Sequence, residues 1–323
     1  MKPRALILYN KIGEDPLPDE LDVLNQVGVV EEALHKLGYT VKREWFDLDL
    51  ARAKKVIGDY GPDIVFNLVE SVDGKGRLIG LAPELLEAMK VPFTGSGAQA
   101  ILITSDKVLT KQLLVLNGIP TGEWFSVDET GMLSPHKRYI IKPLWEDGSV
   151  GISEEGVFSG DDPALRAYIA KTDRSDYFIE EYIHGREFNI SLLGGPDGPQ
   201  VLPPAEIRFV DFPEGKPHVL GYRSKWEEDS FEYIHTVRSF DFPASDRDLL
   251  EKVKGISLQC WKVFGLKGYV RVDIRVSEKG DPCVLEINAN PCISPDAGFY
   301  AACKTAGLEF TGVISRIIND ALR

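Results

Sequence analysis

Oxygen-bearing side chains and an arginine recur at two-residue spacing near the end of the chain. Arg271 and Asp273 lie in one run of strand character, and Glu286 and Asn288 lie in a second. Residues two apart in a strand face the same side of a sheet, so each pair points together. If the two strands are antiparallel neighbours, their oxygens suit Mg²⁺, with phosphate and water completing its shell. A solvated sheet face with ion pairs is the competing interpretation.

Two lysines upstream offer what a bound triphosphate requires. Lys107 begins a predicted helix, and Lys142 ends the apolar run 139–141. A lysine at the end of a buried strand is costly to bury unless an anion meets it. The stretch 147–152 follows, and its two glycines let backbone N–H groups approach a phosphate. It is not a Walker loop, and a plain hairpin is the alternative interpretation.

Two glutamates, Glu180 and Glu187, flank a predicted turn between strands. Alternating strand positions around such a turn bring both carboxylates toward one side. We therefore expect them near the hydroxyls and the amino group of a nucleotide.

The elements that must position these groups change character along the chain. Up to about residue 103, strands alternate with helices, which indicates a parallel α/β domain. Beyond it, a helix capped by Ser105-Asp106 opens an α+β pattern. The strands are expected at 4–9, 40–46, 63–69, 124–127, 138–144, 177–183, 187–193, 269–276 and 283–287. The other helices are expected at 21–37, 82–89, 163–170 and 245–264. Residues 211–244 are predicted to form a long loop of the lid type.

Charge and composition narrow the class of protein. The 323 residues carry a formal charge of −13, which repels nucleic acid and anionic membranes. No apolar run approaches the roughly 20 residues that span a bilayer. The four cysteines lack CxxC spacing, which favours reduced thiols. We therefore expect a cytoplasmic protein that has small-molecule substrates and neither nucleic acid nor membrane as a partner.

Taken in order, these motifs resemble the ATP-grasp superfamily and, within it, the D-alanine–D-alanine ligase-like carboxylate–amine ligases. The most telling are GYVRVDI at 268–274 and LEINANP at 285–291. The other matching segments are 63–71, 91–97, 105–111, 118–121, 140–152, 178–188 and 204–207. The resemblance implies a three-domain fold that clamps ATP between two domains, with two Mg²⁺ ions and an acyl phosphate that an amine attacks. With the element pattern it predicts an N-terminal parallel-sheet domain (1–103), a central ATP-grasp subdomain (104–184) and a C-terminal ATP-grasp subdomain (185–323). A homodimer is a further expectation from the resemblance.

The resemblance also implies roles for single residues. In the nucleotide site, Lys107 and Lys142 hold the phosphates, Glu180 lies on the adenine side and Glu187 contacts the ribose. The remaining members of the implied nucleotide site are Gly148, Glu181 and Ile183.

At the reacting end, the resemblance implies that Asp273, Glu286 and Asn288 bind the magnesium ions. Arg271 stabilises the oxyanion of the tetrahedral intermediate, where negative charge develops. Lys225 corresponds to a lysine of the lid near the transferred phosphate, for which a surface charge is the alternative interpretation.

The substrate side departs from the family pattern. The family joins a Glu, a Ser and a Tyr around the first substrate, but the Ser position falls on Gly148 or Ser149 and the Tyr position on Trp226. The family Glu has no counterpart, and Asp19 and Glu20 are the nearest acidic candidates. After the NP motif, Cys292 replaces a glycine, and Ala297 replaces a hydroxyl donor to the second substrate. Losing that donor costs about 1 to 3 kcal/mol.

The nucleotide machinery therefore matches the family and the substrate pockets do not. We predict an ADP-forming carboxylate–amine ligase that acts on amino-acid-like substrates other than the usual D-alanine pair. Three alternatives remain: D-alanine–D-alanine ligase proper, a nucleotide-binding protein without ligase activity, and a kinase with the same fold.

Overall fold

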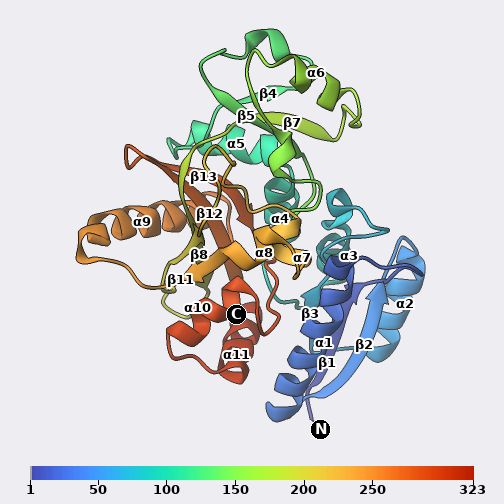
Figure 1. The fold of residues 1–323 in the computed structure, drawn as a ribbon. Helices are drawn as coiled ribbons and strands as arrows, with labels where there is room; N and C mark the ends of the chain where they lie inside the picture. Colours follow the sequence, from blue (N-terminus) through green and yellow to red (C-terminus); the bar gives the residue numbers. More distant parts are fainter. Residues whose placement is uncertain (1) are drawn as a thin grey trace.

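The computed structural model describes residues 2–323, and Figure 1 shows the three sheets that it contains. The first sheet is parallel, in the order β2-β1-β3. Its strands are β1 (Arg4–Asn10), β2 (Thr40–Phe46) and β3 (Ile64–Leu68). The connecting helices are α1 (Pro18–Lys36), α2 (Leu50–Tyr60) and α3 (Leu81–Met89).

Both faces of this sheet are buried, which explains why its strands read as continuous apolar runs. Ile7 packs under α1, whereas its neighbours Leu6 and Leu8 point to the opposite face, under α2 and α3. The two cores are separate because successive strand side chains alternate between faces.

The second sheet is antiparallel, in the order β4-β7-β5-β6. Its strands are β4 (Trp124–Ser126), β5 (Arg138–Pro143), β6 (Val157–Ser159) and β7 (Tyr177–Glu181). Helix α6 (Pro163–Ile169) packs on this sheet, whereas α4 (Ala98–Ser105) and α5 (Lys107–Leu116) contribute apolar residues to the core of the third sheet. As predicted, α5 is capped by Asp106, whose Oδ1 accepts a hydrogen bond from the Leu109 N–H at 2.9 Å.

The third sheet is the largest, in the order β11-β10-β8-β12-β13, with β9 paired to β8. Its strands are β8 (Gly185–Leu193), β9 (Gln200–Val201), β10 (Ala205–Phe209), β11 (Thr236–Ser239), β12 (Tyr269–Ser277) and β13 (Pro282–Asn288). Helix α9 (Arg247–Val263) covers one face through Val253, Ile256 and Cys260. The final helices, α10 (Gly298–Thr305) and α11 (Phe310–Ala321), join the core under α1. The C-terminal helices therefore pack the first sheet and its helices, which we call the first lobe, against the third sheet.

The region predicted as a long loop, residues 211–244, contains regular structure, so that prediction is wrong in part. It holds two short helices, α7 (Arg223–Trp226) and α8 (Phe231–His235), and it ends with β11. Both helices lie at the centre of the molecule, between the first lobe and the third sheet (Figure 1). We call residues 211–244 the lid segment.

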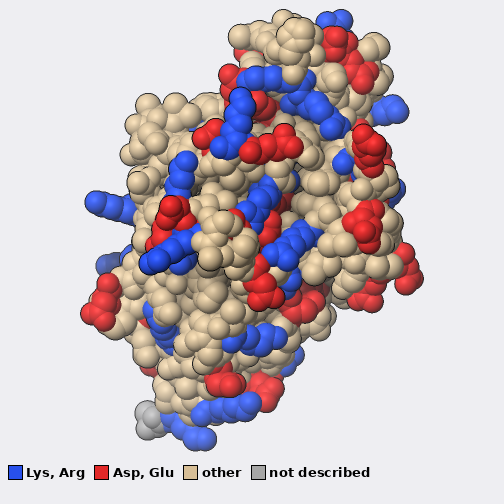
Figure 2. All heavy atoms as spheres, turned by 60° about the vertical axis from the view of Figure 1, so that its left-hand side comes forward, with Lys and Arg blue, Asp and Glu red and all other residues tan. Residues whose placement is uncertain are grey.

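Two further properties agree with the composition. Lys and Arg side chains are interspersed with Asp and Glu over the face drawn in Figure 2. All four cysteines are free thiols, and no helix within residues 2–323 is long and apolar enough to cross a membrane.

Candidate active site

Strands β12 and β13 are antiparallel neighbours, and their register places the chemical residues opposite one another. Arg271 pairs with Asn288 and Asp273 pairs with Glu286, just before a β-bulge that follows Asp273. The Arg271 guanidinium donates from Nε and Nη2 to the two oxygens of Asp273, each at 2.8 Å. The Asn288 amide donates to Asp273 Oδ2 at 3.2 Å and to Glu286 Oε1 at 3.4 Å. Hydrogen bonds therefore connect the four groups in the order Arg271, Asp273, Asn288, Glu286.

The donor set Asp273, Glu286 and Asn288 fits magnesium. Two carboxylates and one amide are hard oxygen ligands of the kind that Mg²⁺ takes together with phosphate and water. Residues 2–323 contain no cluster of three or more His, Cys, Asp or Glu side chains able to hold a metal. The mixed carboxylate–amide set on β12 and β13 is the candidate metal site.

Positive charge surrounds Glu286. Burial raises the pKa of this carboxyl, but Lys107, Lys225 and Arg271 outweigh that effect and bring the pKa to about 2. Lys107 comes from α5, Lys225 from α7 and Arg271 from β12. Residues from three distant parts of the chain thus converge on one carboxylate, as binding of a polyanion with a metal requires.

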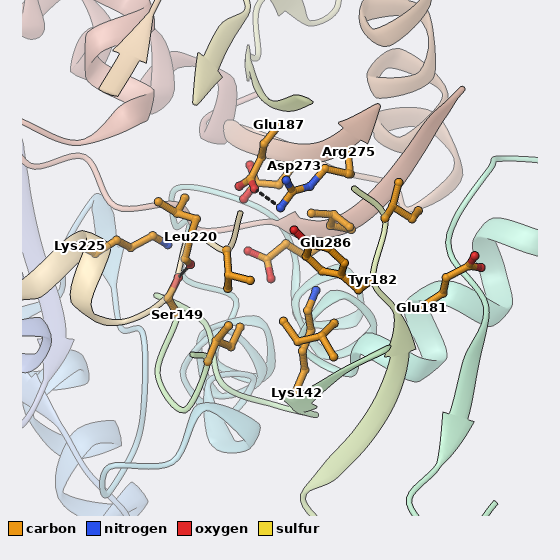
Figure 3. A pocket seen from close by; sticks show the side chains of 15 residues that line it. Lys142, Ser149, Glu181, Tyr182, Glu187, Leu220, Lys225, Asp273, Arg275 and Glu286 are labelled. Atoms are coloured by element: carbon orange, nitrogen blue, oxygen red, sulfur yellow. Dashed lines mark hydrogen bonds and ion pairs between the residues drawn. The ribbon is translucent and has the colours of Figure 1, made fainter. Parts of the chain in front are cut away.

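Asp273, Glu286 and Lys225 border a cavity between the second and third sheets, drawn in Figure 3. Lys142 and Glu286 point into it from opposite walls, and Lys225 reaches it from the lid segment. Ile140, Ile183 and Leu285 supply apolar surface in the same cavity. A cavity with cations and carboxylates beside an apolar wall suits a nucleotide, whose base is flat and apolar and whose phosphates are charged.

Glu180 and Glu187 lie beside this cavity, already paired with cations. Glu187 lines it and forms an ion pair with Arg275 at 2.7 Å. Glu180 is buried between Lys111 and Lys142, with its Oε2 at 2.6 Å from Lys142 Nζ. Neither pairing was expected from the sequence. Lys111 lies in a predicted helix and Arg275 in a predicted strand, and nothing in the sequence around them marks either residue as a partner of a glutamate.

Glu181 and Lys107 reach their positions in different ways. The Glu181 side chain points away from the cavity centre and pairs with Lys137 at 3.1 Å. Only its main chain is available to a ligand in the cavity. The Lys107 ammonium is anchored by the Glu146 carbonyl at 2.5 Å and lies 3.5 Å from Asp147 Oδ1.

The lid segment is fastened to the glycine-containing loop at 147–152. Ser149 Oγ donates to the Leu220 carbonyl at 2.6 Å, and Trp226 Nε1 donates to the Gly148 carbonyl at 3.0 Å. Both loop residues have positive φ, 66° at Gly148 and 67° at Ser149. The loop thus turns its carbonyl and hydroxyl toward the lid at the cost of a strained serine.

A second contact joins the lid segment to the start of α1. Tyr222 of the lid segment donates its hydroxyl hydrogen bond to Asp19 Oδ1 at 2.9 Å, at the start of α1. Glu20, the other acidic candidate, accepts from the Leu17 N–H at 2.9 Å and so caps its own helix. Of the two candidates, Asp19 therefore contacts the lid segment, whereas the Glu20 carboxylate is engaged in capping α1.

Two acidic residues near the reacting end were missed by sequence reasoning. Asp22 accepts hydrogen bonds from the Cys292 thiol at 2.9 Å and from the Ser294 hydroxyl at 2.8 Å. Glu70 accepts from Gln26 at 2.9 Å, and burial, against the hydrogen bond from Gln26, raises its pKa to about 7. Like Lys142, Glu70 is a charged residue at the end of a buried apolar run, so its burial carries the same cost.

A cleft between two antiparallel sheets, with lysines at one end and an arginine, two carboxylates and an amide at the other, defines the ATP-grasp class of ligases. Comparison with known proteins agrees. A family model described as the D-ala D-ala ligase C-terminus matches residues 135–319. A D-alanine–D-alanine ligase of Rickettsia typhi is 30% identical over 306 residues, 94% of this chain and 88% of that protein. An uncharacterized protein y4sG of Sinorhizobium fredii is 32% identical over 265 residues, 80% of this chain and 75% of that protein.

A solved structure shows the same fold. The D-alanine–D-alanine ligase from Bacillus anthracis complexed with ATP covers 99% of this chain and 98% of its own, with a TM-score of 0.76 and 20% identity. The chain therefore belongs to the D-alanine–D-alanine ligase family. It is an ATP-dependent carbon–nitrogen ligase, and the predicted superfamily and fold class are confirmed.

Proposed function

We propose that this ligase phosphorylates the carboxylate of an amino-acid-like substrate and joins it to an amine. We further propose that the two substrates are not the usual pair of D-alanines. The observation that carries the proposal is the cavity lined by Lys142, Lys225 and Glu286, beside which Arg271 forms an ion pair with Asp273. Binding alone would not need an arginine placed where an oxyanion develops.

Magnesium would be held by Asp273, Glu286 and Asn288, with two ions expected. When bound, it supplies charge neutralisation for the transferred phosphoryl group. The Asn288 amide nitrogen donates to the carboxylates of Asp273 and Glu286. Ligation of a metal through the amide oxygen therefore requires the side-chain amide to rotate. The phosphates would then be met by Lys107, Lys142 and Lys225.

Arg271 is suited to stabilise the tetrahedral intermediate. Its Nε and Nη2 are engaged by Asp273, while its Nη1 makes no hydrogen bond to any of residues 2–323. The bidentate pair fixes the guanidinium plane. The free N–H groups can therefore meet charge that appears only during attack, the condition under which an interaction accelerates the reaction.

The ammonium of the first substrate would be received by Glu70 and Asp22. Asp22 lies on α1 and Glu70 follows β3, and Asp22, Asp147 and Asp19 add to the negative field at Glu70. No lysine or arginine compensates Glu70 through a hydrogen bond or ion pair within residues 2–323. A cationic group arriving there would offset the burial and the repulsion that together raise the pKa of Glu70.

The lid segment would exclude water from the acyl phosphate. Its contacts reach Ser149 of the central loop and Asp19 of the first lobe. A closed lid favours aminolysis over hydrolysis because the amine then competes with little water. In this proposal residues 104–184 and 185–323 clamp ATP, and residues 1–103 contribute to the substrate side.

The setting is proposed to be the cytoplasm, where ATP is available and the four free thiols stay reduced. A homodimer remains a prediction from the resemblance.

The second candidate function is D-alanine–D-alanine ligase proper, favoured by relatives of that name. The test is a screen of single amino acids and amino-acid pairs for ATP-dependent phosphate release, with product mass recorded. Release with a pair that excludes D-alanine, together with a ligated product, supports the proposal. D-Alanyl-D-alanine as the main product would replace it with the second candidate, and release with one amino acid and a phosphorylated product would indicate a kinase.

A further inference from the structure

Lys111 is a completely buried lysine for which the proposed chemistry has no use. It lies on α5, one turn after Lys107, and its exposed fraction is 0%. Its ammonium pairs with Glu180 Oε1 and donates to Thr121 Oγ1 at 2.8 Å. Taking a charge out of water costs several kcal/mol, and replacing a buried ion pair by apolar residues is often neutral or stabilising. Stability is therefore a poor explanation for a lysine at this position.

Glu180 connects this lysine to the nucleotide cavity. Its Oε1 faces Lys111, and its Oε2 lies 2.6 Å from Nζ of Lys142, whose side chain lines the cavity. The Lys142 contact is an ion pair without hydrogen-bond geometry, so Oε2 is a buried acceptor that lacks a directed donor. The order Lys111, Glu180, Lys142 is thus a line of alternating charge that leads from the interior to the cavity.

The position of Lys111 is itself fixed from a third side. Thr121 Oγ1, which accepts from Lys111, donates to the Val284 carbonyl at 2.7 Å. The Val284 N–H donates to the Pro120 carbonyl at 2.8 Å, which holds the two segments together. Val284 belongs to β13, the strand that carries Glu286. Lys111 therefore joins α5, β7 and β13, three elements that bear residues of the proposed site.

We propose that Lys111 is a positioning residue for ATP binding, which fixes the Glu180 carboxylate so that Glu180 holds the Lys142 ammonium at the phosphate side of the cavity. This inference rests on the proposed role of Lys142. Lys111 itself does not reach the cavity lining, so its effect on ATP passes through Glu180.

The charges around Glu180 give the inference a distinctive signature. Burial raises the pKa of Glu180, but Lys111 and Lys142 together outweigh it and keep the pKa below the usual value. Cys283 of β13 lies near both Lys111 and Glu180, and burial raises the pKa of its thiol. Without Lys111, one of the two opposing cations is lost, so Glu180 takes up a proton at a higher pH and releases Lys142.

The test is the ATP dissociation constant, measured by calorimetry in magnesium buffer from pH 5.5 to 9. We compare the native protein with Lys111→Met and with Lys55→Met, a control that breaks an exposed ion pair to Asp59. Lys111→Met should weaken ATP binding more than tenfold at pH 6, with a loss that narrows steadily toward pH 9. Lys55→Met should match the native protein at every pH.

Two further variants keep the test decisive. If Lys111→Met does not fold, Lys111→Gln retains N–H donors without the charge and should show the same upward shift of the acid limb. In a Glu180→Gln background, Lys111→Gln should add less than twofold, because the group through which it acts no longer titrates. An equal loss at all pH values, or full additivity of the two changes, would overturn the inference.

Lys142→Met separates this inference from the proposed function. If Lys142→Met loses ATP affinity while Lys111→Met behaves like Lys55→Met, only the role of Lys111 is wrong. If Lys142→Met binds ATP as the native protein does, the proposed nucleotide site itself fails.

Discussion

Tyr222 of the lid segment and Asp19 at the start of α1 share a hydrogen bond of 2.9 Å, although 203 residues separate them in the chain. The contact joins the lid segment to the lobe that is proposed to receive the first substrate. Burial and Asp19 together raise the pKa of Tyr222 to about 12, so the tyrosine stays a donor throughout the physiological range.

Tyr222→Phe should weaken lid closure. A hydrogen bond to a charged acceptor contributes about 1.5 to 3 kcal/mol, so a loss of about ten- to a hundredfold in kcat is expected. The share of ATP hydrolysed without product should rise, because an open lid admits water. Phosphate release and product formation are measured side by side, with Tyr233→Phe on α8 as the control. Equal losses in both variants, or tight coupling in Tyr222→Phe, would show that the contact does not hold the lid.

Glu70 should make the protein less stable as pH rises. Its pKa is about 7 in the folded protein, against about 4.5 when unfolded, so the native state binds more protons between these values. The free energy of unfolding therefore falls from pH 4.5 to 7, by up to about 3 kcal/mol from this group.

Glu70→Gln should remove this slope while keeping an acceptor for Gln26. Urea unfolding at pH 5 and pH 8 measures it, with Glu84→Gln on the exposed side of α3 as the control. The Gln variant should gain stability relative to the native protein at pH 8 and not at pH 5. An identical difference at both pH values would mean that Glu70 titrates normally, and the ammonium site proposed for it would lose its support.

Cys292 should behave as a hydrogen-bond donor and not as a nucleophile. Burial, followed by Glu70 and Asp22, raises the pKa of its thiol well above the usual value, and the thiolate is the reactive form. Iodoacetamide at pH 7.5 should label it more slowly than an unfolded cysteine, as followed by mass spectrometry. Cys292→Ser keeps a donor for Asp22, and the hydrogen bond contributes about 1 kcal/mol whether a thiol or a hydroxyl donates it. The variant should therefore retain at least about half of the turnover. A complete loss of turnover would indicate covalent catalysis.

Features that depend on residues close together in the sequence could be predicted for this protein. The two-residue periodicity of 271–273 and 286–288 predicts which side chains share a face, and the observed register brings those faces together. The parallel first sheet and most strand positions follow from apolar runs of the right length. The predicted helix at 245–264 is observed at 247–263.

What the sequence does not reveal is set by contacts between distant segments. The burial of Lys111 arises from its packing against Glu180 and Thr121, and a lysine at an ordinary helical position gives no sign of it. The pairing of Tyr222 with Asp19 depends on how the lid crosses between lobes. The lid helices α7 and α8 are too short for periodicity to show, and their stretch is rich in charged residues.

The most direct test of the whole account is turnover of Asp273→Asn with the substrate pair that supports phosphate release. Asp273 is both a proposed magnesium ligand and the partner that orients Arg271, so product formation should fall at least about a hundredfold, the range found when one electrostatic group of an active site is removed. Asp241→Asn, which alters an exposed carboxylate beyond β11, should leave turnover unchanged. Native turnover in Asp273→Asn would contradict the assignment of the site.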